Sequence, residues 1–196
     1  MNCVLNGYNN FSKKYRGVSG LASTLTKTTI NPTITTMREI DESLDGKIDY
    51  IFCATSTCGT LRGCCEYLKQ KGRSTKIIAV DAYGSIIFGG APNNRLIPGH
   101  GSSVRPEIYR DGLADRVVYV NDAECVAGCR SLLKEEAILT GGSSGAIISG
   151  FAKVKNEIPE KSNVVLILPD RGERYLDTIY NSKWVSKNLG EIPSLL

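Results

Sequence analysis

The sequence predicts an α/β protein in which a mostly parallel sheet carries helices on both faces. From about residue 31 onward, short apolar runs alternate with amphipathic stretches, which is the pattern of successive β-α units. The apolar runs lack the alternation of a strand with one solvated face, so they are expected to be buried on both sides. Of the 196 residues, 41% are hydrophobic and 22% are charged, a balance that supports a packed core in one domain of ordinary size.

Four strands and three helices are predicted in order along the chain. The strands are expected at residues 49–54, 76–80, 117–120 and 163–168. The helices are expected at residues 60–71, 122–136 and 146–157, with Asn121 as the N-cap of the second. In a parallel sheet with right-handed crossovers, the loops that follow the strands meet at one edge, where ligands bind. Candidate site residues are therefore sought in those loops.

Composition narrows the class of function. The 24 basic and 20 acidic residues are dispersed along the chain, whereas a nucleic-acid binder concentrates its positive charge. No stretch approaches the roughly 20 apolar residues of a membrane span, and the N-terminus lacks a signal-peptide pattern. The 7 cysteines are an odd number and only one histidine is present, so reduced, buried thiols are favoured over disulfides or zinc. A cytoplasmic protein without nucleic-acid or membrane partners is expected.

The first candidate site is the segment S-T-C-G-T, residues 56–60, between a predicted strand and a predicted helix. Small residues let the backbone approach an anion, and the N–H groups at the start of a helix point toward it. An ordinary turn with an N-cap explains the same residues equally well. The segment lacks the Gly-Lys-Ser/Thr of a Walker loop and the G-x-G-x-x-G of a dinucleotide site.

Two further glycine-rich segments are candidate ligand contacts. G-G-S-S-G, residues 141–145, precedes a helix and exposes Ser143 to a close neighbour; the alternative is a serine N-cap. It lacks the spacing of a hydrolase nucleophile elbow. The loop I-P-G-H-G-S-S, residues 97–103, is too glycine-rich for a simple connector and is expected to close on a ligand. Its lone His100 is otherwise expected to be solvated, and the charged run of residues 169–175 is expected to form local ion pairs.

Taken in order, these motifs resemble the fold-type II pyridoxal-phosphate enzymes, the family of cysteine synthase and cystathionine β-synthase. The resemblance spans about residues 31–190 and includes T-T-M-R-E-I, D-A-Y-G-S, L-I-P-G-H-G, G-G-S-S-G and P-D-R-G-E-R-Y-L-D-T-I-Y. It implies a large domain like that of the tryptophan synthase β subunit. The variants S-T-C-G-T and I-P-G-H-G are similar to the branch that makes N-(2-amino-2-carboxyethyl)-L-glutamate.

The resemblance assigns roles residue by residue. The residues implied to hold the phosphate of pyridoxal 5'-phosphate (PLP) are Ser56, Thr57, Cys58, Gly59 and Thr60. Ser143 would hydrogen-bond the pyridine nitrogen, and a neutral serine there would leave that nitrogen unprotonated. The implied loop on the substrate side contains Gly99, His100, Gly101 and Ser102.

In this branch the implied reaction replaces the phosphate of O-phospho-L-serine with the amine of L-glutamate. The product leads to 2,3-diaminopropionate for siderophores, and a homodimer is expected from the family. One alternative is a cysteine synthase that uses O-acetylserine and sulfide. Another, from a different class, is a catalytically inactive protein that only binds the cofactor.

The N-terminal region departs from the family pattern. Members carry a smaller domain with an S-x-K lysine and an S-G-N turn before the phosphate loop, and no S-G-N turn occurs here. Ser12-Lys13-Lys14 matches S-x-K, so Lys14 is the candidate for the Schiff-base lysine, ahead of Lys13. An ordinary surface lysine explains Lys14 equally well. Residues 1–30 are expected to form a lysine-bearing segment and connector, and residues 31–196 the PLP-binding large domain.

Overall fold

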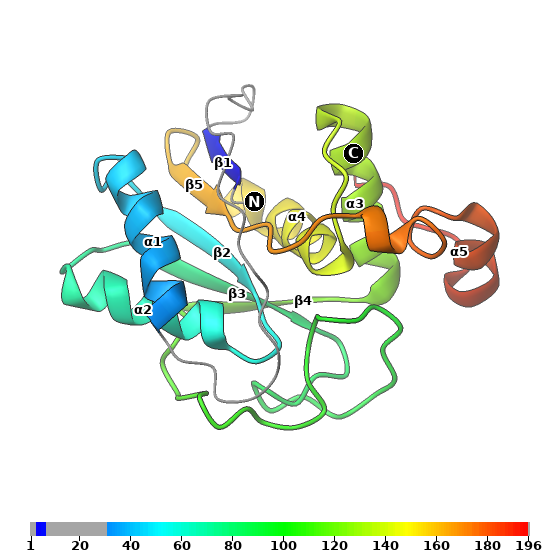
Figure 1. Cartoon of the computed structure of the whole chain (residues 1–196), viewed down its shortest axis with the longest axis horizontal. Helices are drawn as coiled ribbons and strands as arrows, with labels where there is room; N and C mark the ends of the chain where they lie inside the picture. Colours follow the sequence, from blue (N-terminus) through cyan, green and yellow to red (C-terminus); the bar gives the residue numbers. More distant parts are fainter. Residues whose placement is uncertain (1–2, 7–30, 196) are drawn as a thin grey trace.

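The computed structural model describes residues 3–6 and 31–195 (Figure 1). The candidate lysine Lys14 lies outside the described residues. Its assignment as the Schiff-base lysine therefore stays a prediction.

Five strands form one sheet in the order β1-β5-β2-β3-β4. They are β1 (Cys3–Asn6), β2 (Tyr50–Ala54), β3 (Lys76–Ala82), β4 (Arg116–Val120) and β5 (Asn163–Leu166). Strands β5, β2, β3 and β4 run parallel, and β1 pairs antiparallel with β5. The four strands predicted from apolar runs are all present, which confirms the mostly parallel sheet.

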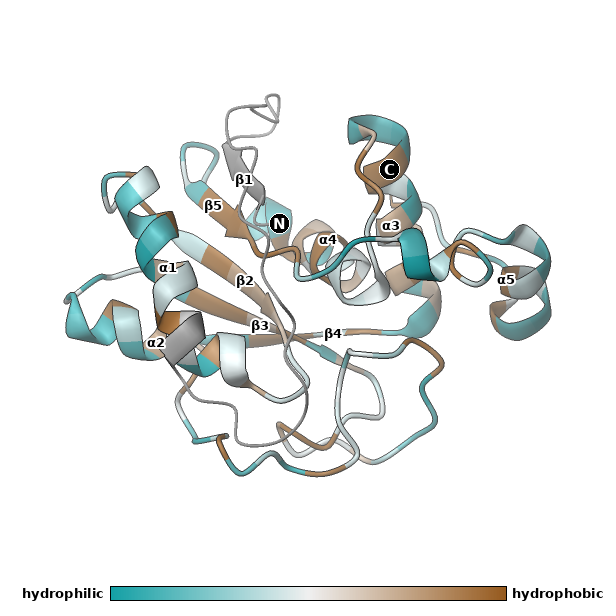
Figure 2. Cartoon of the chain, in the orientation of Figure 1, coloured by the Kyte–Doolittle hydropathy of each residue, from teal (hydrophilic) through white to brown (hydrophobic). Residues whose placement is uncertain are grey.

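Helices cover both faces of the sheet, as predicted (Figure 1). They are α1 (Asn31–Ser43), α2 (Gly59–Gln70), α3 (Asp122–Glu136), α4 (Gly142–Val154) and α5 (Ser182–Leu189), with 3-10 turns η1 (Lys155–Glu157) and η2 (Glu173–Tyr175). Helices α1 and α2 pack on one face, and α3 and α4 pack on the other. Figure 2 shows largely hydrophobic strands that lie between the more hydrophilic α1 and α2 on one face and α3 and α4 on the other.

The two faces of the sheet form two separate hydrophobic cores. In β2, Phe52 points into the core with α3 and α4, whereas Ile51 and Cys53 point into the core with α1 and α2. All three side chains are fully buried. Since successive residues of a strand face opposite sides, a strand buried on both sides must be apolar throughout. This is why β2 reads as a continuous apolar run.

Helix α3 matches its prediction from residue 122 to residue 136. Asn121 is its N-cap: the Asn121 side chain accepts from the Glu124 N–H, and the Glu124 side chain accepts from the Asn121 N–H. Helix α4, in contrast, begins at Gly142, four residues before the predicted start at 146. Its N-cap is Gly141, with no side-chain cap hydrogen bond. The alternative in which Ser143 is an N-cap is therefore wrong.

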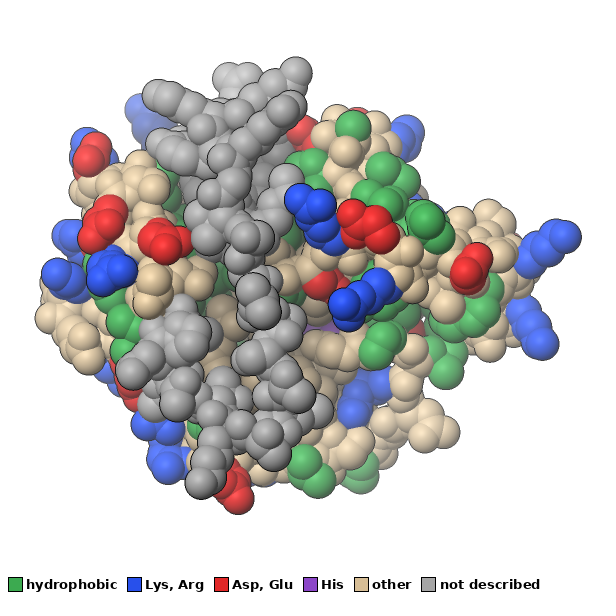
Figure 3. Space-filling model, in the orientation of Figure 1, with side chains coloured by type: hydrophobic (Ala, Val, Ile, Leu, Met, Phe, Trp, Pro, Cys, Tyr) green, Lys and Arg blue, Asp and Glu red, His purple; other side chains and the backbone are tan. Residues whose placement is uncertain are grey.

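The thiols were predicted to be reduced and buried, and the charged side chains to be dispersed. The six cysteines of the described side chains are free and buried. Within residues 3–6 and 31–195, no helix is both long and apolar enough to cross a membrane. Figure 3 shows acidic and basic side chains interspersed on the face that it presents.

Candidate functional site

The candidate site lies where the order of the strands reverses. The chain passes from β2 to its neighbour β3 and then to β4, while β5 pairs with the other side of β2. Ligands of open parallel sheets bind beyond the carboxyl ends of the strands at such a point. Here the loop after β2 contains Ser56, and the loop after β5 contains Asp170. The two loops follow hydrogen-bonded neighbours in the sheet.

The loop after β2 leads directly into α2, and its geometry suits an anion. The N-cap of α2 is Cys58, in a left-handed conformation with φ 64° and without a side-chain cap hydrogen bond. No acidic residue occupies the first turn of the helix. The first N–H groups of a helix have no partner within it and carry partial positive charge. The start of α2 can therefore bind a phosphate, flanked by the half-buried hydroxyls of Ser56, Thr57 and Thr60.

A buried carboxylate anchors this loop from β3. The Thr55 hydroxyl donates to Asp81 Oδ1 at 2.7 Å, and the Thr55 N–H donates to the Val80 carbonyl at 2.9 Å. Asp81 is fully buried, and its Oδ2 has no hydrogen-bond partner among the described residues. Burial raises the pKa of Asp81. The carboxylate thus fixes Thr55, the residue immediately before Ser56.

The loop of residues 99–102 lies against the same point. The Gly101 N–H donates to the Thr55 carbonyl at 2.7 Å, and the Ser102 N–H donates to Ser85 Oγ at 3.1 Å. Gly101 has φ +73°, and a Cβ there would lie 2.7 Å from the Cβ of Ala82. Only glycine meets both conditions without strain. The predicted substrate-side loop is thus hydrogen-bonded to the residue that precedes the phosphate loop.

His100 is buried in this loop, so the alternative in which its side chain is solvated is wrong. Only 3% of its surface is exposed, and neither Nδ1 nor Nε2 has a hydrogen-bond partner among the described residues. Burial, and secondarily the charge of Arg95, lower its pKa to about 4. His100 is therefore a neutral imidazole at pH 7, with one donor and one acceptor left for a ligand.

Ser143 lies in the first turn of α4 and is buried. Its hydroxyl donates to Asp170 Oδ1 at 3.2 Å, across from the end of β5. The loop of His100 reaches this helix as well, because a Cβ on Gly142 would lie 2.1 Å from a methyl carbon of Ile97. One loop therefore contacts both segments: Gly101 lies beside Thr55, which precedes residues 56–60, and Ile97 covers Gly142 at the start of α4.

Asp170 and Asp81 are the polar groups that the sequence analysis did not assign to the site. The run of residues 169–175 was expected to form ion pairs; Arg171 and Glu173 do approach to 3.7 Å, but Asp170 instead accepts hydroxyl protons. The signal for Asp81 was a carboxylate at the end of an apolar strand, since buried Asp side chains are rare unless paired. The signal for Asp170 was its place directly after the last apolar run.

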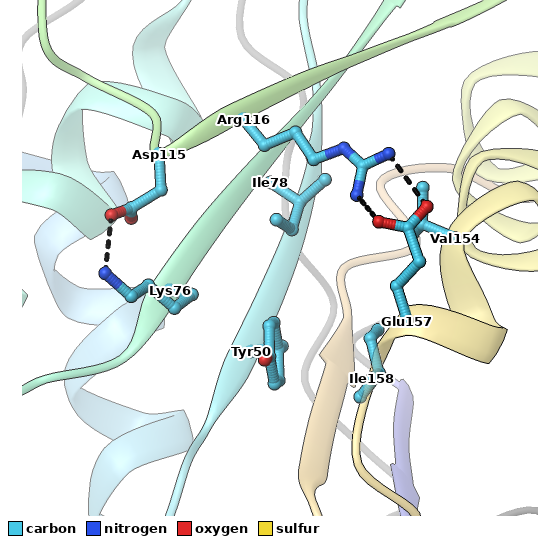
Figure 4. Close-up of a pocket in the computed structure, with 8 residues that line it drawn as sticks. All are labelled: Tyr50, Lys76, Ile78, Asp115, Arg116, Val154, Glu157 and Ile158. Carbon is cyan, nitrogen blue, oxygen red and sulfur yellow. Dashed lines mark hydrogen bonds and ion pairs between the residues drawn. The ribbon is translucent and has the colours of Figure 1, made fainter.

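A separate cavity of about 320 Å³ opens at the opposite edge of the sheet (Figure 4). Tyr50, Lys76 and Arg116, the first residues of β2, β3 and β4, line it together with Glu157. Its charged residues are paired: Lys76 lies 3.1 Å from Asp115, and the Arg116 guanidinium makes two hydrogen bonds to the Glu157 carboxylate. The cavity contains no residue of the candidate site.

The fold and these loops define a doubly wound α/β protein with an uncapped helix start, free of acidic residues in its first turn, at the switch point of its sheet. The family model of the pyridoxal-phosphate dependent enzymes matches residues 16–170. The chain belongs to this family, which confirms PLP as the cofactor of its class. The match begins two residues after Lys14.

Solved structures show the same relationship. An O-acetylserine dependent cystathionine β-synthase from Helicobacter pylori is 30% identical, with a TM-score of 0.72 over 78% of this chain and 50% of that one. An O-acetylserine sulfhydrylase, isoform 3, from Entamoeba histolytica is 31% identical, with a TM-score of 0.69 over 79% of this chain and 49% of that one. An O-ureido-L-serine synthase, at 24% identity and a TM-score of 0.72 over 83% of this chain and 51% of that one, shares the fold. The chain spans about half the length of these relatives.

The residues of the site fit PLP. An uncapped helix start without acidic residues suits the phosphate group of PLP. The buried nitrogens of His100, which have no hydrogen-bond partner among the described residues, suit a polar ligand beside them, because leaving such groups unpaired costs about 1–3 kcal/mol each. Ser143 supplies a hydroxyl at the neighbouring helix start. These three features lie at one edge of the sheet.

Proposed function

We propose that the chain is a PLP-dependent β-replacement synthase that joins O-phospho-L-serine to L-glutamate and releases phosphate. The product is N-(2-amino-2-carboxyethyl)-L-glutamate, a precursor of 2,3-diaminopropionate in siderophore synthesis. One observation carries the proposal: the uncapped helix start after β2 and the Ser143–Asp170 contact after β5 both lie at the carboxyl edge of the sheet. A homodimer in the cytoplasm completes the proposal.

In this proposal each loop has one task. The N–H groups and hydroxyls of residues 56–60 bind the cofactor phosphate, and Ser143 contacts the ring nitrogen. PLP supplies an electron sink that permits a β-substituent to leave an amino acid and a nucleophile to add. The amine of Lys14 is the proposed covalent attachment point and moves a proton at its Nζ. The loop of residues 99–102 excludes water from the substrate side.

An anionic leaving group suits the side chains beside His100. Arg95 is held by its loop, since its guanidinium donates to the Gly84 carbonyl and to Ser103 Oγ, the latter at 2.9 Å. The charge of Arg95 reaches His100, where it lowers the imidazole pKa. A phosphate group would gain from this positive charge and from a neutral imidazole N–H, whereas an acetyl group would gain only from the N–H. This supports O-phosphoserine over O-acetylserine.

The second candidate function is a cysteine synthase-type reaction, favoured by the O-acetylserine named for two of the related structures. Turnover of O-phosphoserine with glutamate is compared with turnover of O-acetylserine with sulfide at equal concentrations. We expect activity with the first pair, and phosphate release that depends on glutamate. Activity with the second pair alone would show that O-acetylserine and sulfide are the substrates instead of O-phosphoserine and glutamate.

A third candidate is a protein that binds the cofactor without turnover. The purified chain is incubated with PLP, reduced with borohydride and digested for peptide mass mapping. We expect the reduced adduct on Lys14; Lys14→Ala should abolish it, and the matched control Lys13→Ala should keep it. PLP binding without a covalent adduct would favour the third candidate. An adduct on another lysine would assign the covalent attachment of PLP to that lysine and not to Lys14.

A further inference from the structure

The cavity at the amino-terminal edge of the sheet opens into a hydrophobic core (Figure 4). Ile78 of β3 and Val154 of α4 line it, and both side chains are buried in the core that α3 and α4 form with the sheet. The half-buried Tyr50 and Ile158 also line it and pack against the same core. Its volume of about 320 Å³ is that of a small-molecule site. An apolar group placed there would leave water for the edge of a packed core.

Four charged side chains line the cavity, and their charges balance. Lys76 and Arg116 are basic, whereas Asp115 and Glu157 are acidic. A phosphate site has an excess of positive charge, and a site for a hard divalent cation has several oxygens facing one point. Among the described residues, no three His, Cys, Asp or Glu side chains are grouped so that they could hold a metal ion. A balanced lining instead suits a ligand that carries one charge of each sign.

The two ion pairs of the cavity differ in what they leave for a ligand. Asp115 is occupied at both oxygens, since Oδ1 accepts from Lys76 Nζ at 3.1 Å and Oδ2 accepts from the Ile77 N–H at 2.8 Å. Arg116 gives two of its five N–H donors to Glu157, at 2.5 Å and 3.0 Å. Each Glu157 oxygen accepts one of these bonds and has two lone pairs. The Arg116–Glu157 pair can therefore receive a further anion and a further cation without breaking.

This pair is open to solvent and lies beside the apolar part of the cavity. The side chains of Arg116 and Glu157 are 44% and 58% exposed. Figure 4 shows the Arg116 guanidinium reaching from β4 toward Glu157, with Val154 and Ile158 next to that carboxylate. A ligand with two opposite charges at one end and an apolar group at the other would meet both parts at once.

We propose that the cavity binds an α-amino acid with an apolar side chain. The ligand carboxylate bonds to Arg116, its ammonium group bonds to Glu157, and its side chain packs against Ile78 and Val154. Such an amino acid carries one charge of each sign on neighbouring atoms, as the Arg116–Glu157 pair does.

This amino-acid site is separate from the candidate cofactor site. Lys76 begins β3, whereas Asp81 lies near the other end of that strand. Val154 ends α4, whereas Ser143 lies in the first turn of that helix. The two sites are therefore at opposite edges of the sheet, and binding of an amino acid here does not depend on the proposed function.

Equilibrium dialysis of the full chain with radiolabelled L-leucine or L-phenylalanine tests the site. Free PLP is removed first, because its aldehyde condenses with amino acids. We expect saturable binding of one amino acid per chain. Hydrocinnamate lacks the ammonium group of L-phenylalanine, and phenethylamine lacks its carboxylate. Each analogue should compete about tenfold more weakly than L-phenylalanine, because it loses one charge-assisted hydrogen bond.

Variants locate the binding. Arg116→Gln and Glu157→Gln each remove one charge at an exposed position, and both should weaken binding about tenfold. The matched control Arg38→Gln removes the arginine of the exposed Arg38–Glu42 pair on α1 and should bind as the wild type does. Ile158→Trp fills the cavity but keeps the charged pair, and it should also lose binding. Urea unfolding midpoints show whether each variant folds.

Three results would overturn the amino-acid site. The first is that neither amino acid binds saturably to the wild-type chain. The second is equal binding in the wild type and in the folded Arg116→Gln and Glu157→Gln variants. The third is weaker binding in Ser143→Ala alone, which would place the amino acid at the candidate cofactor site. None of these results concerns the attachment of PLP, so the proposed function stands or falls by its own experiments.

Discussion

Gly128 of α3 lies directly against Gly145 of α4: a Cβ on Gly128 would be 2.0 Å from the Gly145 carbonyl oxygen. The contact is reciprocal, since a Cβ on Gly145 would lie 2.1 Å from the Cys125 carbonyl oxygen. Glycine here lets two helix backbones touch, and the Cys129 thiol donates to the Gly141 carbonyl at 3.2 Å across the same interface. The position of Ser143 therefore depends on how closely α3 approaches α4.

Gly128→Ala should separate these helices and destabilise the fold. Overpacking of this kind costs about 1–3 kcal/mol, which exceeds the helix-propensity gain of about 1 kcal/mol from Gly to Ala. We expect a lower urea midpoint and weaker PLP binding. The control Lys134→Ala, at an exposed position of α3, should change the free energy of unfolding by no more than about 0.5 kcal/mol. An unchanged Gly128→Ala midpoint would mean that the helices can part freely.

The buried His100 should make the fold less stable in mild acid. Its pKa is about 4 in the folded chain, against 6.5 for the ordinary side chain. Below pH 6.5 the unfolded chain takes up a proton there that the folded chain refuses, so the free energy of unfolding falls until about pH 4. The full loss is about 3 kcal/mol.

The His100→Gln variant isolates this effect, because glutamine is polar but does not titrate. The raised pKa of Asp81 acts in the opposite direction, stabilising the folded chain as its carboxylate protonates. Urea unfolding at pH 7.5 and pH 5 should therefore show that His100→Gln loses less free energy of unfolding on acidification than the wild type does. Equal losses would show that His100 titrates normally.

Buried thiols should resist alkylation in the native chain. Burial is the main reason that the pKa values of Cys58 and Cys129 rise to about 12. At pH 8 the thiolate fraction of such a group is about 1 in 10⁴. Iodoacetamide labelling followed by mass mapping should modify these two residues slowly in buffer and rapidly in guanidinium. Rapid native modification of Cys58 would show that the phosphate loop opens.

Thr60→Asp should lower the affinity for PLP without lowering the stability of the fold. An acidic residue in the first turn of α2 interacts favourably with the helix dipole, by about 0.3–1 kcal/mol, so the thermal midpoint should hold or rise. The same charge repels a phosphate at the helix start, so PLP affinity should fall at least tenfold. Thr60→Ser is the control that keeps the hydroxyl. Unchanged PLP affinity in Thr60→Asp would place the phosphate elsewhere.

Local sequence patterns predicted the four parallel strands of the sheet and the place of the candidate loops along the chain, but not the antiparallel edge strand β1. Strands such as β2 are fully apolar because both of their faces are covered, and helix α3 carries its capping box in Asn121 and Glu124. These are local signals, each contained within a few residues. The loop of residues 56–60 could be proposed as a phosphate site for the same reason, because a run of small residues between a strand and a helix is visible without knowing its neighbours.

The contacts that the loops make depend on how distant segments pack together. Helix α4 begins at Gly142 although glycine is a poor helix former, since packing against α3 at Gly145 outweighs that preference. Asp170 meets Ser143 from 27 residues away because α4 packs on β2 and β5 lies beside β2 in the sheet. His100 is buried because its loop is bonded to Thr55. Contacts of this kind are set by strand order and close packing, which no short window of sequence contains.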